Sequence, residues 1–128
     1  MQENAECHED YLKAIYLISK KNRGGWVSNK EISDFLKIKP ASVSNMLYKL
    51  KNLDFIYWKP RSPIRLSSKG KEIVQELLRN YNCLQNFFKQ VLNLKDPQLI
   101  QVLCCKIEHL ITPEVSNALD ELTTMGTI

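Results

Sequence analysis

Hydrophobic residues recur at helical spacing along most of the chain, and one short stretch with a strand-like pattern interrupts them. The spacing predicts helices over about 6–20, 28–36, 41–53, 68–92, 97–111 and 113–123. Between the third and fourth of these helices, residues 55–59 and 64–66 predict two strands joined by a turn at 60–63. The sequence therefore predicts a mainly α fold with a small β-hairpin.

The order of these elements predicts a winged helix-turn-helix. Ser28 with Glu31 forms a capping box before the second helix, and a tight turn at 37–40 leads into the third. The hairpin that follows is the predicted wing. We assign residues 1–70 to this domain and residues 71–128 to a helical dimerisation domain. The helix at 68–92 carries more apolar residues than one small domain needs, so part of it is expected to meet a second subunit.

Charge is unevenly distributed between these two parts. Residues 1–70 carry thirteen Lys and Arg against seven Asp and Glu, whereas residues 71–128 carry five against seven. The N-terminal half is therefore the one expected to face a polyanion. The sequence has neither a signal-peptide pattern at its start nor an apolar stretch of membrane-spanning length. We accordingly expect a soluble, cytoplasmic protein that does not act at a membrane.

The third helix is the predicted DNA-reading element, because this helix of the motif presents its N-terminal residues to base edges in the major groove. The residues predicted to face the bases are Lys39, Ala41, Ser42, Ser44 and Asn45. Asn45 can pair bidentately with adenine, and Ala41 can contact a thymine methyl group. Phosphate contacts are predicted for Lys49, Lys59, Arg61 and Arg65. A winged helix can also serve purely in protein–protein contact, and that alternative stays open.

The cysteines indicate thiol or metal chemistry, since four of them are too few for a disulfide scaffold. Cys105, Glu108 and His109 have the i, i+3, i+4 spacing that brings side chains to one face of a helix. A thiol, a carboxylate and an imidazole there can chelate a transition metal. We expect no enzyme, because such spacing suits a shared ion better than a catalytic dyad, and no Gly-rich oxyanion-stabilising loop is evident.

Three stretches carry a resemblance to a known family: EDYLKAIYLI, KPASVSNMLYKL with LSSKGKEI, and CCKIEHLITPEV. From about Glu9 to Leu119 the chain resembles the diphtheria-toxin-repressor family of iron- and manganese-dependent regulators, in its short form without the SH3-like domain. The resemblance implies a homodimer that binds a palindromic operator in double-stranded DNA. It also implies a divalent metal that acts as corepressor and bridges the first helix to the dimerisation helices.

The resemblance also implies a set of metal ligands. Cys105, Glu108 and His109 match primary-site ligands of iron-type members, and Asp10 stands where manganese-type members place an aspartate. Two carboxylates, one imidazole and one thiolate suit iron(II), cobalt, nickel or zinc better than manganese. Iron(II) is the expected physiological ion, with zinc next. Cys7 and His8 lie just before Asp10 and are left out of the predicted site.

The chain also departs from the family pattern. The second metal site of the family is replaced by Tyr81, Gln85 and Gln101, so a second site is not expected. Lys13 stands one helical turn from Asp10, where manganese-type members have a glutamate, and this argues against a binuclear manganese centre. Lys13 also leaves open that its charge replaces the metal. The alternative function is therefore a metal-independent winged-helix regulator that senses a small molecule or a redox change.

Overall fold

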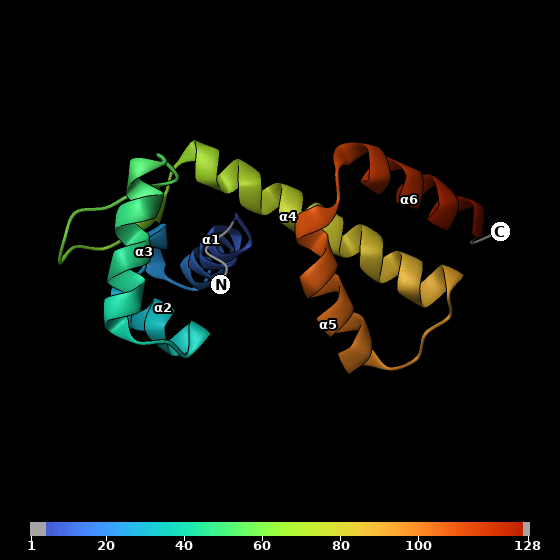
Figure 1. Cartoon of the computed structure of the whole chain (residues 1–128), viewed down its shortest axis with the longest axis horizontal. Coiled ribbons are helices and arrows are strands. Elements are labelled where there is room, and N and C mark those ends of the chain that lie inside the picture. Colours follow the sequence, from blue (N-terminus) through green and yellow to red (C-terminus); the bar gives the residue numbers. More distant parts are fainter. Residues whose placement is uncertain (1–4, 127–128) are drawn as a thin grey trace. The chain divides into compact units, whose positions relative to one another are not determined.

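The computed structural model describes residues 5–126, with side chains described for residues 8–125. The chain divides into two compact units, Met1–Val74 and Gln75–Ile128. This division falls inside helix α4 (Figure 1), whereas the sequence analysis placed a boundary after Gly70. The predicted fold class is confirmed: the described residues are mainly helical and form one two-stranded antiparallel sheet.

The first unit contains the three helices of the predicted motif, α1 (Ala5–Ser19), α2 (Asn29–Leu36) and α3 (Pro40–Asn52). The predicted capping box starts α2, because the Glu31 N–H donates to Ser28 Oγ at 3.1 Å and the Ser28 N–H donates to Glu31 Oε1 at 2.9 Å. Lys37, in the left-handed conformation with φ 58°, ends α2. The chain therefore turns sharply from α2 into α3.

The core of the first unit is formed where the apolar stripes of these helices meet. Helix α1 packs against α2 and the sheet, and α2 packs against α3. Leu12, Ile15, Ile32, Leu47 and Leu50 are completely buried there. Burial of one such side chain contributes about 1.5–3 kcal/mol, so this core holds α3 in place with its polar face outward.

The two strands of the wing are shorter than predicted, but the wing also pairs with a residue outside the hairpin. Strand β1 (Ile56–Tyr57) pairs antiparallel with β2 (Arg65–Leu66), and Ile56 lies opposite Leu66. Val27 adds a third position to the sheet, since its N–H and carbonyl both bond to Ile64 at 2.9 and 2.7 Å. The wing is therefore tied to the segment that precedes α2.

The wing leads into α4 (Ser68–Asn86) through a compact junction. Ser67 caps this helix, since its Oγ accepts the Gly70 N–H at 3.1 Å. The Ser67 N–H donates to the Phe55 carbonyl at 2.9 Å, and its hydroxyl donates to the Asp54 carbonyl at 2.7 Å. Ser67 thus joins the segment that follows α3 to the start of α4.

In the second unit, α4 continues into a π-helical turn at Phe87–Val91 and is followed by α5 (Pro97–Ile107) and α6 (Pro113–Gly126). Asp96 caps α5, because its side chain accepts the Gln98 N–H at 3.0 Å. Helix α6 packs against the π-helical turn. The buried core of this unit is formed by Leu84, Phe88, Ile100 and Cys104.

The end of α5 differs from the prediction of one helix over 97–111. The α-helix ends at Ile107 and tightens into a 3-10 turn at Glu108–Leu110. The buried Asn80 amide donates to the carbonyls of Glu108 at 3.1 Å and Ile111 at 3.3 Å. A side chain from α4 therefore satisfies carbonyls that would otherwise continue the helix, and Pro113 disfavours α conformation just beyond.

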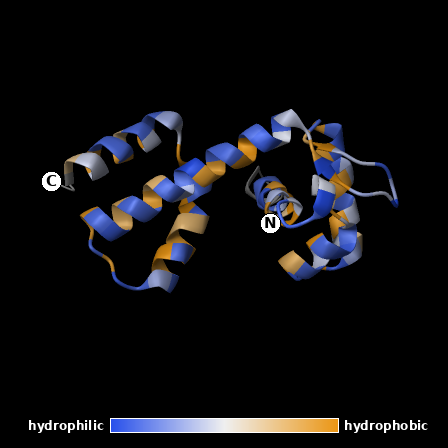
Figure 2. Cartoon of the chain, turned by 180° about the vertical axis from the view of Figure 1, so that it is seen from behind, coloured by the Kyte–Doolittle hydropathy of each residue, from blue (hydrophilic) through white to orange (hydrophobic). Residues whose placement is uncertain are grey.

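The helices are amphipathic, and hydrophobic and hydrophilic residues alternate along α4 in Figure 2. This pattern is typical of helices that bury one face and expose the other. Within residues 5–126, no helix has both the length and the hydrophobicity that crossing a membrane requires.

We predict that Gly70→Ala destabilises the protein. A Cβ at Gly70 would collide with the Phe55 carbonyl oxygen and lie 3.3 Å from Leu66 Cδ2. The loss should be about 1–3 kcal/mol, although alanine favours helix. Urea unfolding measures the change, and Lys71→Ala at an exposed neighbouring site is the control. A Gly70→Ala variant as stable as that control would contradict the prediction.

Candidate nucleic-acid interface and metal centre

Helix α3 presents the predicted reading residues on its exposed face. It begins at Pro40, after Lys39 at the N-cap, and buries Val43, Met46, Leu47 and Leu50. The remaining face exposes Lys39, Ala41, Ser42, Asn45 and Lys49. These are side chains with donors, acceptors and positive charge, which are the groups that read bases and bind phosphates.

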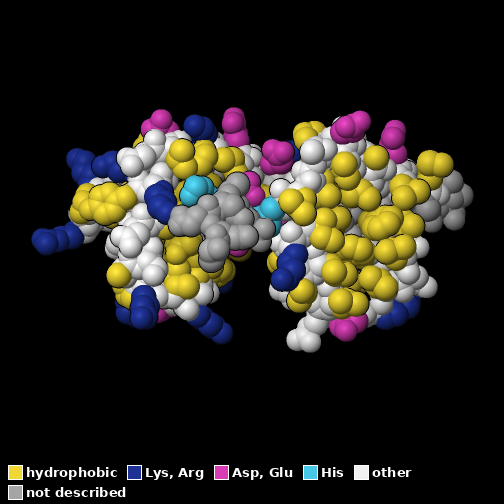
Figure 3. Space-filling view, viewed as in Figure 1, with side chains coloured by type: hydrophobic (Ala, Val, Ile, Leu, Met, Phe, Trp, Pro, Cys, Tyr) yellow, Lys and Arg dark blue, Asp and Glu magenta, His cyan; other side chains and the backbone are white. Residues whose placement is uncertain are grey.

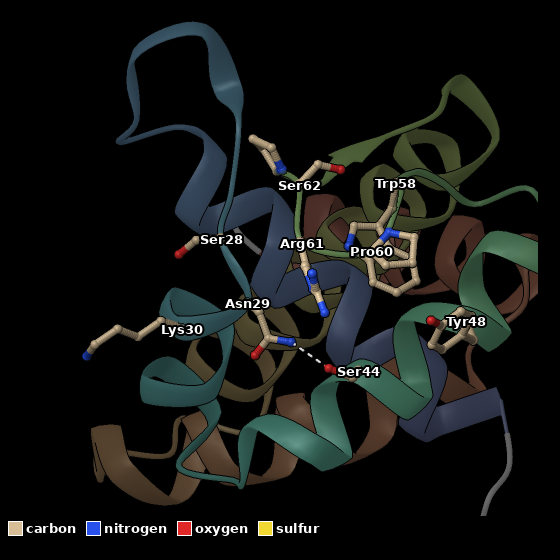
Figure 4. Close-up of a pocket in the computed structure, with 10 residues that line it drawn as sticks. Ser28, Asn29, Lys30, Ser44, Tyr48, Trp58, Pro60, Arg61 and Ser62 are labelled. Carbon is tan, nitrogen blue, oxygen red and sulfur yellow. Dashed lines mark hydrogen bonds between the residues drawn. The ribbon is translucent and has the colours of Figure 1, made fainter.

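A groove of about 580 Å³ separates the start of α2 from α3 and the wing (Figure 4). Ser44 and Arg61, both predicted DNA contacts, line it, and Arg61 points toward Asn29 and Ser44. Ser44 Oγ accepts a hydrogen bond from Asn29 Nδ2 at 2.9 Å. Ser44 thus faces the groove and links α2 to α3.

The groove contains polar residues that the sequence analysis missed. Ser28, Asn29 and Lys30 line it from the start of α2, and Tyr48 and Ser62 line it from α3 and the wing. Tyr48 packs edge-on against Trp58, with ring centroids 4.8 Å apart. Two features of the sequence could have indicated these residues. Asn29 and Lys30 directly follow the helix cap at Ser28, and Tyr48 lies one helical turn after Ser44, on the same face of α3.

The basic residues of the wing have different surroundings. Arg61 lies at the wing tip with φ 67°, next to a turn in which the Ser62 hydroxyl donates to the Lys59 carbonyl at 2.6 Å. The Arg65 guanidinium lies over the Trp26 ring, 4.9 Å from its centroid. Lys59 lines a second hollow together with Trp26. Arg61 is thus the wing cation that lines the groove beside α3.

The predicted metal ligands are divided between the two units. Asp10 is exposed on α1 in the first unit, whereas Cys105, Glu108 and His109 belong to the second. Cys105 lies in the last turn of α5, and Glu108 and His109 lie in the 3-10 turn that follows. The spacing had predicted that all three lie on one continuous α-helix. In the structure, the α-helix ends before Glu108.

Glu108 and His109 form the most buried polar pair of this region. The Glu108 side chain is 1% exposed and the His109 side chain 4%, with His109 Nε2 at 3.6 Å from Glu108 Oε2. Cys105 is half-buried. Carboxylate, imidazole and thiolate donors are ligands that divalent transition metals accept, so the donor chemistry fits such an ion.

Among the side chains that the structure describes, no three His, Cys, Asp or Glu gather into one metal-binding group. The four-ligand site therefore stays a prediction. Lys13, which stands one turn from Asp10, is half-buried on α1, and so is His8. The Cys7 side chain lies outside the described residues. Of the positions predicted to replace the family's second site, Tyr81 packs against the core of the second unit.

Cys83 and Cys104 are buried thiols in different environments. Cys104 fills the core of the second unit. Cys83 donates to Asp120 Oδ1 at 3.1 Å. Burial, and then the hydrogen bond to this carboxylate, raise the pKa of the Cys83 thiol to about 11. A thiol that stays protonated at neutral pH reacts slowly with oxidants, which argues against Cys83 as a redox sensor.

The second unit exposes several large hydrophobic side chains. Leu110 is 76% exposed, Met125 66% and Val102 51%. Figure 3 shows hydrophobic side chains over much of the visible face of this unit. Exposed apolar surface of this kind is typical of a contact with another protein.

Two family models match nearly the whole chain. Residues 5–63 match the N-terminal DNA binding domain of the iron dependent repressor. Residues 67–125 match the metal binding and dimerisation domain of the same family.

Individual proteins agree with this match. An uncharacterized HTH-type transcriptional regulator of Methanocaldococcus jannaschii is 34% identical over 107 residues, which are 84% of each chain. The HTH-type transcriptional regulator MntR of Shouchella clausii is 26% identical over 114 residues, 89% of this chain and 77% of that protein. The solved structure of the manganese regulator SloR has a TM-score of 0.75 at 26% identity and covers 97% of this chain. The chain spans about half of that structure, since 55% of it is matched.

We predict that Asp120→Asn makes Cys83 more reactive. Loss of the carboxylate should lower the thiol pKa by at least about half a unit and speed alkylation about threefold at pH 8. Iodoacetamide labelling followed by peptide mass spectrometry measures the rate, with Cys105 in the same sample as the reference. Glu121→Gln is the matched control. An unchanged ratio of Cys83 to Cys105 labelling would contradict the assignment.

Proposed function

This chain belongs to the iron-dependent repressor family, and on that premise we propose that it is a homodimeric repressor of metal-homeostasis genes that binds a palindromic operator when a divalent metal is bound. The family consists of metal-dependent DNA-binding transcriptional regulators that dimerise through the C-terminal domain. The observation that carries the proposal is the presence of both domains, DNA-binding and metal-binding, over residues 5–125. A protein that binds the chromosome acts in the compartment that contains it, which we propose is the cytoplasm.

We propose that α3 reads the operator and that the groove beside it receives the DNA backbone. The exposed side chains of Asn45, Ala41 and Ser42 are of the types that recognise base edges. Arg61 in the groove and Lys49 on α3 would bind phosphates. Lys30 and Tyr48, which line the same groove, extend this set.

We propose Asp10, Cys105, Glu108 and His109 as the metal ligands. The support lies in the second unit, where a carboxylate and an imidazole are both nearly inaccessible to water and 3.6 Å apart. A carboxylate and an imidazole are ligand types that divalent transition metals accept. Asn80 holds the turn that carries them by donating to the Glu108 and Ile111 carbonyls.

Iron(II) is the ion that we propose for the cell. The ligand set contains a thiolate and an imidazole, which favour iron(II), zinc, cobalt or nickel over manganese. The similarity to a structure described as a manganese regulator keeps manganese among the ions to be tested. Similarity by itself does not select the ion, because the matching family models are those of an iron dependent repressor and the similar structure is a manganese regulator, so a direct comparison is needed.

The homodimer is proposed from the apolar surface of the second unit. Leu110, Val102 and Met125 are more than half exposed, and exposed apolar surface of this kind is typical of a contact with another protein. A symmetric dimer would present two copies of α3, and a two-fold related pair of reading helices matches a palindromic operator.

The central experiment is operator binding by metal-free protein with and without anaerobic iron(II). Zinc, cobalt, nickel and manganese are tested in parallel, and the promoter of the protein's own gene is the probe. We expect binding to tighten about 5–150-fold with the active ion, the range of typical allosteric coupling. Equal binding with chelator and with every ion would favour the alternative regulator that senses a small molecule or redox change.

We predict that Glu108→Gln and His109→Gln each lower metal affinity at least about tenfold and remove most of the metal stimulation of operator binding. Competition against a chromophoric chelator measures the affinity, and fluorescence anisotropy measures operator binding. Glu114→Gln, an exposed position at the start of α6, is the control. Wild-type metal stimulation in either variant would refute the ligand assignment.

We predict separable effects for two residues of α3. Asn45→Ala should reduce the preference for operator over scrambled DNA by about 1–3 kcal/mol, because a base contact is lost. Lys49→Gln should weaken binding to both DNAs equally and reduce the salt dependence by about one charge, because a phosphate contact is lost. Metal affinity should not change in either variant. The same loss on both DNAs for Asn45→Ala would contradict its role in base reading.

A further inference from the structure

The outer face of the wing carries a row of aromatic and cationic side chains. Tyr57 lies opposite Arg65 across the strand pair, and the pairing of Val27 with Ile64 places Trp26 beside Arg65. Ile56, Leu66, Val27 and Ile64, which alternate with these residues, are buried on the inner face. Alternation along the strands therefore puts the row on the side away from the core.

These aromatic side chains are unusually accessible. Trp26 is 44% exposed and Tyr57 60%, while Ile64, the residue before Arg65, is completely buried. Two consecutive glycines, Gly24 and Gly25, have φ near 76° and 75° and bring the chain to Trp26. The Arg65 guanidinium lies over the Trp26 ring at 4.9 Å. The local backbone thus holds a large ring at the surface with a cation against it.

The row borders a hollow of about 410 Å³. Its walls are formed by Trp26, Tyr57, Trp58 and Pro63, and Lys59 and Ser62 complete the lining. The volume is within the range of small-molecule sites, which are mostly apolar with a few polar groups. The lining residues include a lysine and contain no carboxylate, so the site favours a negatively charged ligand.

We propose that this hollow binds a small planar aromatic molecule that carries a negative charge, either an aryl carboxylate or a nucleotide. Flat rings stack on tryptophan and tyrosine, and Lys59 with the neighbouring Arg65 attracts the anionic group. Base faces in double-stranded DNA are stacked on one another and present only their edges in the grooves. The exposed rings therefore suit a free planar molecule better than duplex DNA.

The hollow also has a route to regulation, a step that depends on the proposed DNA-binding function. Trp58, Ser62 and Pro63 line both this hollow and the groove beside α3. A ligand that moves these residues changes the wing surface next to Arg61. Coupling of this kind is reciprocal, so operator and ligand should alter each other's affinity by the same factor.

The test uses the full chain labelled with ¹⁵N, without metal or DNA, so that it does not depend on the proposed function. The chain has two tryptophans and hence two indole N–H signals, and Trp26→Phe assigns them. The probes are 1-naphthoate, adenosine monophosphate and, as the charge control, 1-naphthylmethylammonium. We expect a saturable shift of the Trp26 signal with at least one anion and a markedly weaker response to the cation. Which anion binds distinguishes the carboxylate from the nucleotide.

Variants make the test specific. Trp26→Ala, followed at the Trp58 indole signal because Trp58 lines the same hollow, should weaken binding at least about fivefold through lost stacking. Lys59→Gln should weaken it about two- to fivefold through lost charge. Lys71→Gln, an exposed lysine on α4, should bind as wild type does. The Trp58 signal reports whether each variant is folded. The proposal is overturned by no saturable Trp26 shift, by equal binding of the cation, or by unchanged binding in both variants. A single-stranded decanucleotide that binds tenfold tighter than the monophosphate would also overturn it.

Discussion

The junction at Ser67 is the interaction on which the first unit depends. The Ser67 N–H and hydroxyl donate to the carbonyls of Phe55 and Asp54, and its Oγ caps α4 through the Gly70 N–H. Phe55 in turn donates to the Leu50 carbonyl at the end of α3. Helix α3, the wing and the first turn of α4 therefore meet largely through backbone groups. A residue without a side chain is needed at Gly70 because the Phe55 carbonyl occupies the space.

This junction leaves the wing with two faces of different character. One face borders the groove beside α3, where Arg61 supplies positive charge and the Asn29–Ser44 hydrogen bond links the two helices of the motif. The other face exposes Trp26 and Tyr57 around Arg65, whose charge is held against the indole ring. Arg65 is stacked on an indole ring whereas Arg61 lines the groove, so the basic residues of the wing have different surroundings.

The second unit contains several buried polar side chains that make specific contacts. Asn80, Glu108 and the Cys83 thiol are all nearly inaccessible to water. Asn80 bonds the carbonyls that end α5, and Cys83 bonds Asp120 on α6. Polar groups in such positions require specific partners, and these partners determine where α5 ends and how α6 lies on the core. The Glu108–His109 pair is placed by that same turn.

The sequence by itself determined the helices, the capping box at Ser28, the helix-turn-helix with its wing, the exposed polar face of α3 and the family. These features depend on residues within a few positions of one another, so periodicity and cap signals report them. Only the tertiary structure decided the Val27–Ile64 pairing, the groove lined by Asn29 and Tyr48, and the end of α5. Their partners are distant in the chain: Asn80 reaches Glu108 across 28 positions and Cys83 reaches Asp120 across 37. The ligand set was predicted from spacing and resemblance and stays a prediction. The helix expected over 97–111 ends at Ile107, and Asn80 of α4 donates to carbonyls of the turn that follows.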